Sequence, residues 1–236
     1  MKDIRSLTFE ELKAEVSALN MPAFRTKQIY GWLHKTPVFS FDEMTNISKA
    51  DRQKLGEVFT LDPMTIADVQ ISKLDGTRKY LFRLGDGHLI ESVMMRYHYG
   101  ISVCVSTQVG CRMGCRFCAS TVGGRVRDLA PSEILDQVYR IEADTGERVS
   151  HVVLMGSGEP FDNYDAVVRF LRLISDPEGK KIASAQNLGR LFCGTKYDDL
   201  KDALKVLQPQ QLDLVRKVYW ENVDQREIAA DEGVDE

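Results

Sequence analysis

The stretch Cys111-Arg-Met-Gly-Cys115-Arg-Phe-Cys118 gathers three of the five cysteines of this 236-residue chain. It follows residues 101–106, an apolar run that predicts a β-strand, so the cysteines are expected on the loop after that strand. The odd cysteine count disfavours a disulfide framework, and the opening MKDIRSLTFEEL lacks the apolar run of a secretory signal. In a reducing compartment, thiols this close together indicate metal binding.

The spacing C-x3-C-x2-C is typical of one kind of metal centre. Three thiolates can hold three irons of a [4Fe–4S] cluster and leave the fourth iron open. S-adenosylmethionine can bind that iron through its amino and carboxylate groups, and one electron then cleaves it to a 5′-deoxyadenosyl radical. A zinc site is the alternative, but zinc usually needs four protein ligands and no fourth Cys or His lies at a typical spacing. We therefore predict a radical SAM site with Cys111, Cys115 and Cys118 as metal ligands.

The sequence pattern changes three times along the chain. It predicts a helical accessory domain, a β-meander connector, a truncated radical SAM core and a helical tail, over residues 1–60, 61–96, 97–182 and 183–236. The start of the first helix is marked by Thr8-Phe-Glu-Glu11, which resembles a capping box. Hydrophobic residues make up 43% of the chain, which excludes disorder throughout. The net charge of −4 gives no signal for nucleic-acid binding.

The core region alternates between strand and helix patterns. Strand-like residues 101–106 precede a predicted helix at 131–145, and a buried strand predicted at 151–155 precedes a helix at 165–174. Two such βα units imply parallel strands. The expected fold class is α/β: an incomplete radical SAM partial (β/α) barrel, preceded by the helical domain and the meander.

A second motif, Gly156-Ser-Gly-Glu159-Pro160, follows the second predicted strand. Parallel α/β folds place ligands at the carboxyl ends of their strands. Glycines allow close approach of the backbone to a ligand, and Glu159 can accept a hydrogen bond from an ammonium group. A turn of this kind has a structural role about as often as it binds a ligand. One βα unit after the cysteines, it fits a site for the amino group of S-adenosylmethionine.

Several motifs together resemble the RlmN/Cfr family of dual-specificity RNA methyltransferases. They are Cys104-Val-Ser-Thr-Gln-Val-Gly-Cys111 with the cysteine motif, Arg127-Asp-Leu, Glu133-Ile134 with Gln137-Val138, and the Gly-Ser-Gly-Glu-Pro turn. Residues 24–33, 41–46 and 91–94 also resemble that family, so the likeness covers about residues 1–182.

The resemblance implies methylation of adenosine C2 in 23S rRNA and some tRNAs. It also implies a cytoplasmic protein that does not bind a membrane. The implied cofactors are a [4Fe–4S] cluster and S-adenosylmethionine, and the implied electron donor is a protein such as flavodoxin. Cys104 would resolve the protein–RNA adduct through a disulfide, and Glu91 would accept a proton. Gly158 and Glu159 would contact S-adenosylmethionine. From the residues alone, Cys104 would be a buried strand thiol and Glu91 a solvated strand charge.

Four arginines near the cysteines are candidates for RNA phosphate contacts or for a solvated loop: Arg112, Arg116, Arg125 and Arg127. The recognisable motifs end near residue 182. The family's later barrel units and its methyl-carrying cysteine have no match, because Cys193 lies in a different context. Residues 207–234 resemble part of a helix-turn-helix. Three interpretations follow: a methyltransferase that is inactive or active as a truncated chain, a non-catalytic Fe–S and S-adenosylmethionine binding remnant, and a DNA-binding regulatory protein acting through the tail.

Overall fold

The structure is a computed structural model that describes residues 1–61, 64–116 and 118–180. Contacts divide the chain after Ala183, so all described residues belong to the unit Met1–Ala183. The predicted tail helices, the helix-turn-helix likeness and Cys193 lie outside the described residues. No helix in the described ranges has the length and apolar character needed to cross a membrane.

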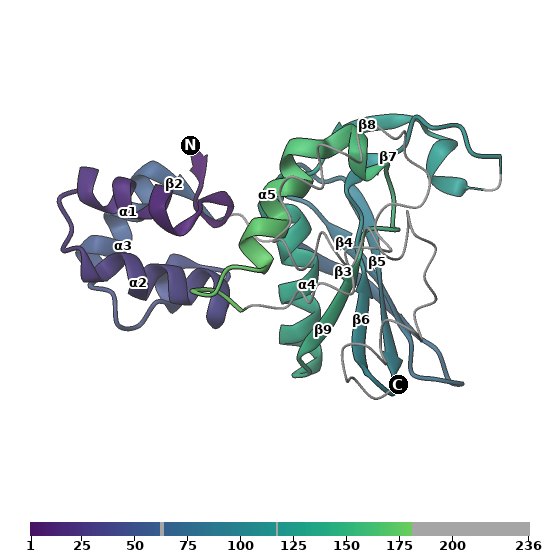
Figure 1. Cartoon of the computed structure of the whole chain (residues 1–236), viewed down its shortest axis with the longest axis horizontal. Coiled ribbons are helices and arrows are strands. Elements are labelled where there is room, and N and C mark those ends of the chain that lie inside the picture. The colour runs from purple at the N-terminus through teal and green to yellow at the C-terminus, as the bar shows by residue number, and fades with distance from the viewer. Residues whose placement is uncertain (62–63, 117, 181–236) are drawn as a thin grey trace, which may run out of the picture. The chain divides into compact units, whose positions relative to one another are not determined.

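The N-terminal region is helical, as expected (Figure 1). Its helices are α1 (Phe9–Ala18), α2 (Phe24–Tyr30) and α3 (Lys49–Val58). The short parallel strands β1 (Lys2–Asp3) and β2 (Phe59–Thr60) bring its two ends together. The predicted capping box is confirmed: Thr8 Oγ1 accepts from Glu11 N, and Glu11 Oε2 accepts from Thr8 N at 2.9 Å.

Helix α2 ends at Tyr30, and the chain continues as a π-helical turn, Gly31–Lys35. The helices enclose a core whose members are fully or almost fully buried. Those with no exposed surface are Ile4, Leu12, Val16, Ile29, Leu33, Met44 and Leu55.

After the N-terminal helices, the main element of the described chain is one five-stranded sheet. Its strands are β3 (Thr65–Ile71), β4 (Arg78–Arg83), β5 (Leu89–Tyr97), β6 (Gly100–Cys104) and β9 (Val149–Val153), in the order β3-β4-β5-β6-β9. Neighbours are antiparallel except β6 and β9, which are parallel as predicted. The three meander strands β3, β4 and β5 belong to this sheet, and β5 pairs directly with β6, the strand that leads to the cysteines.

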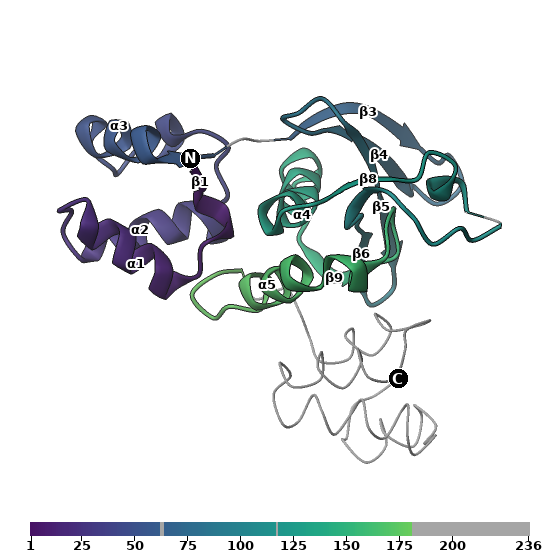
Figure 2. The same cartoon turned by 90° about the horizontal axis from the view of Figure 1, so that it is seen from above.

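Two helices, α4 (Pro131–Thr145) and α5 (Tyr164–Ile174), pack against each other beside the sheet (Figure 2). The predicted bounds of α4 are confirmed. Gly146, at φ 68°, takes the left-handed conformation that ends the helix. Tyr80, Phe82, Ile90, Met94 and Val103 are buried at alternating strand positions. Tyr80 Oη donates to Asp144 on α4 at 2.7 Å, which identifies this as the face that α4 covers.

The second βα strand differs from its prediction. Strand β9 begins at Val149 rather than His151, and only Val149 is buried within it. Among the described residues β9 is the last strand of the sheet, with β6 as its one neighbour. Residues 151–153 are therefore half-buried rather than core. The α/β fold class holds, with two βα units in the described chain.

Candidate functional site

The site is built where β6 and β9 end. The two strands are parallel with Cys104 in register with Val153, so the segments that follow them leave the sheet at the same edge. The backbone N–H groups of Thr107 and Gln108 both donate to Ser157 O, at 2.9 and 3.2 Å. Ser157 N in turn donates to Ser106 Oγ at 2.9 Å. The predicted Gly-Ser-Gly-Glu-Pro turn is thus bonded to the segment that leads from β6 to the cysteines.

Two glycines of this turn have a packing role. A Cβ on Gly158, at φ +104°, would lie 2.6 Å from Gln108 Cβ. A Cβ on Gly156 would lie 2.7 Å from Ser106 Oγ and from Val105 O. Contacts this short are not tolerated, so both positions require glycine for the two segments to pack. This packing accounts for the glycines without a ligand, and the role of Gly158 in binding S-adenosylmethionine stays a prediction.

Glu159 is held within its own turn. Its N–H donates to Gln108 Oε1 at 2.9 Å, and its Oε1 accepts from Phe161 N at 3.2 Å. The carboxylate thereby caps the 3-10 turn Pro160–Asn163. Contact of this half-buried carboxylate with an ammonium group likewise stays a prediction.

The cysteines lie on a loop that joins two strands of a hairpin. We call residues 111–124 the cysteine loop; it connects β7 (Gln108–Gly110) to β8 (Arg125–Asp128), which pair antiparallel. The loop that carries the cysteines therefore ends at Gly124, before β8 begins. A Cβ on Gly110, at φ +73°, would lie 1.9 Å from Gly124 O, so glycine is needed where the hairpin narrows.

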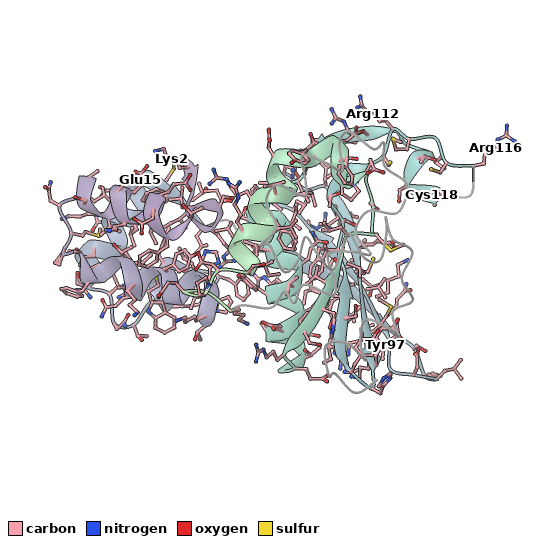
Figure 3. The ribbon with its side chains drawn as sticks, viewed as in Figure 1. Lys2, Glu15, Tyr97, Arg112, Arg116 and Cys118 are labelled. Atoms are coloured by element: carbon pink, nitrogen blue, oxygen red, sulfur yellow. The ribbon has the colours of Figure 1, made fainter. Side chains whose placement is uncertain are left out.

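Cys111, Cys115 and Cys118 are free thiols, buried, exposed and half-buried in that order. Three thiols on one loop are the donor type that an iron–sulfur cluster requires, so the residues fit the group in kind. Within the described ranges, no set of three His, Cys, Asp or Glu side chains is gathered closely enough to hold a metal ion. The structure thus places the three thiols on one loop at the sheet edge, but among the described residues they are not close enough together to bind one metal ion. Figure 3 shows Cys118, Arg112 and Arg116 at one end of the α/β region and Tyr97 at the other.

Glu91 and Cys104 occupy the sheet face that points away from α4. Val93 pairs with Cys104, and Glu91 lies two residues from Val93, so these three side chains share a face. Glu91 Oε1 is 2.6 Å from Lys79 Nζ, and the backbone O of Glu91 accepts from Ser106 Oγ at 2.7 Å. Burial raises the pKa of the Cys104 thiol. The two residues named for proton transfer and adduct resolution therefore lie on neighbouring strands, near the start of the segment that leads to the cysteines.

Three of the four arginines considered for RNA contacts bind carboxylates of the chain. Arg112 pairs with Asp162, Arg125 with Asp128, and Arg127 with both Glu133 and Asp86. Arg116 is exposed. The Arg112 pair links the cysteine loop to the turn after Glu159, whereas Arg125 and Arg127 lie on β8. Neither RNA contact nor a solvated loop, the two interpretations of the sequence, anticipated these intramolecular pairs.

The structure adds site residues that the motif analysis left without a role. Asn163 Nδ2 donates to Thr107 O at 2.9 Å and to Leu129 O at 2.8 Å. Gln108 Nε2 donates to Asp128 Oδ1 at 2.7 Å. Gln137 is fully buried and bonded to Ser92 and Ser106. One signal could have identified Gln137: it is a polar residue among the apolar positions of α4.

Comparison with known proteins gives two family matches. Residues 2–61 match the model RlmN_N, the ribosomal RNA large subunit methyltransferase N-terminal domain. Residues 105–216 match the radical SAM superfamily, which extends the likeness past residue 182, where the recognisable motifs end.

Curated relatives and a solved structure agree with these matches. The chain is 56% identical over 204 residues to the "Probable dual-specificity RNA methyltransferase RlmN" of Lachnospira eligens, covering 86% of this chain and 58% of that protein. The protein of the same name from Lachnoclostridium phytofermentans is 54% identical over 192 residues, covering 81% and 54%. A radical SAM methyltransferase from Sphaerobacter thermophilus superposes with a TM-score of 0.73 and 36% identity, covering 79% of this chain and 55% of that one. The chain spans about half the length of these relatives. By these matches, it belongs to the RlmN family of radical SAM proteins.

Proposed function

We propose that this chain binds a [4Fe–4S] cluster through Cys111, Cys115 and Cys118, and S-adenosylmethionine beside it, as part of an enzyme that methylates adenosine C2 in 23S rRNA and tRNA. One observation carries the proposal. The loop with three free thiols and the turn with Glu159 leave the same edge of one sheet, and they are hydrogen-bonded through Ser106–Gln108.

The chain's own residues supply a framework for the two cofactors. Cluster and S-adenosylmethionine together would supply a 5′-deoxyadenosyl radical when bound. Cys115 is exposed, so an assembling cluster can reach it from solvent. The turn at residues 156–160 would hold the amino end of S-adenosylmethionine through Glu159, with Gly158 keeping its backbone close.

Glu91 and Cys104 are proposed to serve the RNA adduct. The shared sheet face supports this pairing of roles, because a proton acceptor and a resolving thiol must both reach the same part of the RNA adduct. Burial raises the pKa of Cys104, which keeps the thiol protonated until a base acts on it. Lys79 Nζ lies 2.6 Å from Glu91 Oε1, so this ion pair positions the carboxylate on the sheet face. The disulfide of Cys104 belongs to this proposal as well.

The partners follow from the family. The relatives' name, dual-specificity RNA methyltransferase, supports RNA as substrate, and we propose 23S rRNA and tRNA. Cleavage of S-adenosylmethionine requires one electron, for which we propose a small donor protein such as flavodoxin. Because these RNAs and the reducing conditions that the cluster needs are found in the cytoplasm, we propose that the protein acts there.

The test uses the chain reconstituted anaerobically with iron and sulfide, reduced with dithionite and supplied with S-adenosylmethionine and 23S rRNA or tRNA. We expect 5′-deoxyadenosine by chromatography. We expect no C2-methyladenosine by mass spectrometry of the digested RNA, because the family's methyl-carrying cysteine has no match in this sequence. Cleavage of S-adenosylmethionine should vanish in Cys118→Ala and persist in Cys104→Ala. Bound iron without 5′-deoxyadenosine would overturn the radical chemistry and favour the binding remnant, and C2-methyladenosine that disappears in Cys193→Ala would identify Cys193 as the carrier.

A further inference from the structure

Arg112 and Asp162 form a two-point ion pair between the cysteine loop and the segment after Glu159. Arg112 Nε donates to Asp162 Oδ2 at 2.6 Å, and Arg112 Nη2 donates to Asp162 Oδ1 at 2.7 Å. Arg112 directly follows Cys111, and Asp162 lies in the turn that Glu159 caps. The pair therefore links the chain next to one proposed cluster ligand to the chain next to a proposed S-adenosylmethionine contact.

A second contact joins the same two segments. Ser120 Oγ lies 3.1 Å from Ser157 Oγ, so the far part of the cysteine loop is also bonded to the 156–163 segment. The cysteine loop around these contacts is open to solvent: Met113 and Val122 are 54% and 88% exposed. Open loops of this kind gain their position from a few contacts rather than from a core.

Asp162 is the more buried and better fixed of the two partners. Only 16% of the Asp162 side chain is exposed, against 63% for Arg112. The neighbouring Asn163 is buried and bonded to Thr107 O and Leu129 O, so the backbone beneath Asp162 is fixed. Most exposed ion pairs contribute little, but a two-point arginine–carboxylate pair fixes the relative orientation of its partners. Asp162 is thus placed to hold Arg112, and with it the start of the cysteine loop.

We propose that the Arg112–Asp162 pair is a tether that keeps the cysteine loop against residues 156–163, and that both are positioning residues for the cluster and for S-adenosylmethionine. This inference rests on the proposed function. Without the tether, the loop would move away from the 156–163 segment more often. The cluster would then be lost faster, and S-adenosylmethionine would bind less tightly to the cluster-loaded chain.

The test compares Arg112→Gln, Asp162→Asn and the double variant with the unmodified chain. Arg112→Lys keeps the charge but not the two-point geometry. Arg125→Gln is the matched control, because the ion pair of Arg125, at 3.0 Å, is with Asp128 inside the hairpin, and Arg125 acts on Asp162 through its charge at longer range rather than through a two-point contact. Each reconstituted protein is exposed anaerobically to an iron chelator, and iron release is followed over time. The change in the EPR spectrum of the reduced cluster on adding S-adenosylmethionine gives its apparent Kd.

Each single variant should release iron roughly threefold to tenfold faster, with the double variant no worse than either, because the two residues act as one unit. The rate of iron release from Arg112→Lys should fall between those of the unmodified chain and Arg112→Gln. Arg125→Gln should release iron at the same rate as the unmodified chain. The apparent Kd for S-adenosylmethionine should rise in the same order. Urea unfolding of each variant separates local loosening from loss of fold, and the exposed Arg112 variants decide the matter if Asp162→Asn unfolds.

The outcomes separate the two claims. If the unmodified chain takes up no iron, the proposed function fails and the inference fails with it. If the unmodified chain holds its cluster and the Arg112 and Asp162 variants match it in both readouts, the tether alone is overturned. Additive effects in the double variant would also contradict it, since they would mean that the two residues act on separate partners.

Discussion

Gln137 of α4 binds Ser106 through both ends of its side-chain amide. Its Nε2 donates to Ser106 O at 2.9 Å, and its Oε1 accepts from Ser106 N at 2.7 Å. The same Oε1 accepts from Ser92 Oγ on β5 at 2.7 Å. One buried side chain therefore satisfies the backbone of Ser106, two residues after the end of β6, where the chain runs toward the cysteine loop.

Replacing Gln137 by leucine should destabilise the fold. The change leaves Ser106 N, Ser106 O and Ser92 Oγ buried without this partner, at a cost of about 2–4 kcal/mol in the free energy of unfolding. Urea denaturation measures it. The control is Gln53→Leu on the exposed side of α3, which should stay within about 0.5 kcal/mol of the unmodified chain. Equal stability of the two variants would mean that the amide does not hold the strand end.

A buried ion pair joins the N-terminal helices to α4. Arg5 is bonded to Asp136 and to Val38 O, and both charged side chains are almost wholly buried. Arg5→Met should lower the free energy of unfolding by about 3–5 kcal/mol, because Asp136 is left buried without its partner. The double variant Arg5→Met with Asp136→Leu should recover much of the loss. If the double variant were as unstable as the sum of the two single changes, the pair would not be the cause.

Stability should fall with acid through His34. Burial, with the nearby Arg5 guanidinium, lowers the pKa of His34 from 6.5 to about 3. Below pH 6.5 the unfolded chain therefore binds a proton that the folded chain does not, so the free energy of unfolding falls toward low pH. Above pH 6.5 His34 is neutral in both the folded and the unfolded chain, so it causes no loss of stability there. The slope can reach about 1.4 kcal/mol per pH unit.

The window from pH 6.5 to 4.5 isolates His34 from Glu11, whose pKa a hydrogen bond from Arg169 lowers to about 2. Urea denaturation across that window should show a shallower slope in His34→Gln than in the unmodified chain. His34 bonds Tyr139 Oη at 3.1 Å, and glutamine can keep such a bond. The exposed His88→Gln should leave the slope unchanged. An unchanged slope in His34→Gln would contradict the account.

Local pattern predicted much of this structure, and long-range pairing explains what it missed. Helix α4 is bounded by Pro131 and Gly146, which act locally, so its limits follow from the sequence. The meander joined the core sheet because Val93 pairs with Cys104, a contact that no periodicity reveals. The glycines at 156 and 158 suggested a ligand, yet their close neighbours are Ser106 and Gln108, about fifty residues away in the chain. Only the fold shows such approaches.

The same distinction holds within the candidate site. The cysteine spacing and the family likeness follow from neighbouring residues, and the family is confirmed by the comparisons. The partners of Arg112 could not be predicted, because Asp162 lies on another βα unit. The sequence offered phosphate binding or solvation for this arginine, and an intramolecular carboxylate was a third possibility that only tertiary structure reveals.

Cys111, Cys115 and Cys118 are proposed to hold an iron–sulfur cluster. The decisive measurement is iron, sulfide and zinc analysis of the anaerobically reconstituted chain, with Mössbauer spectroscopy. We expect close to four irons and four sulfides per chain, as about one [4Fe–4S] cluster requires. Alanine at any of the three positions should abolish the cluster, whereas Cys104→Ala, on the sheet face, should retain it. Stoichiometric zinc without iron uptake, or a cluster that survives in Cys118→Ala but not in Cys104→Ala, would contradict the claim.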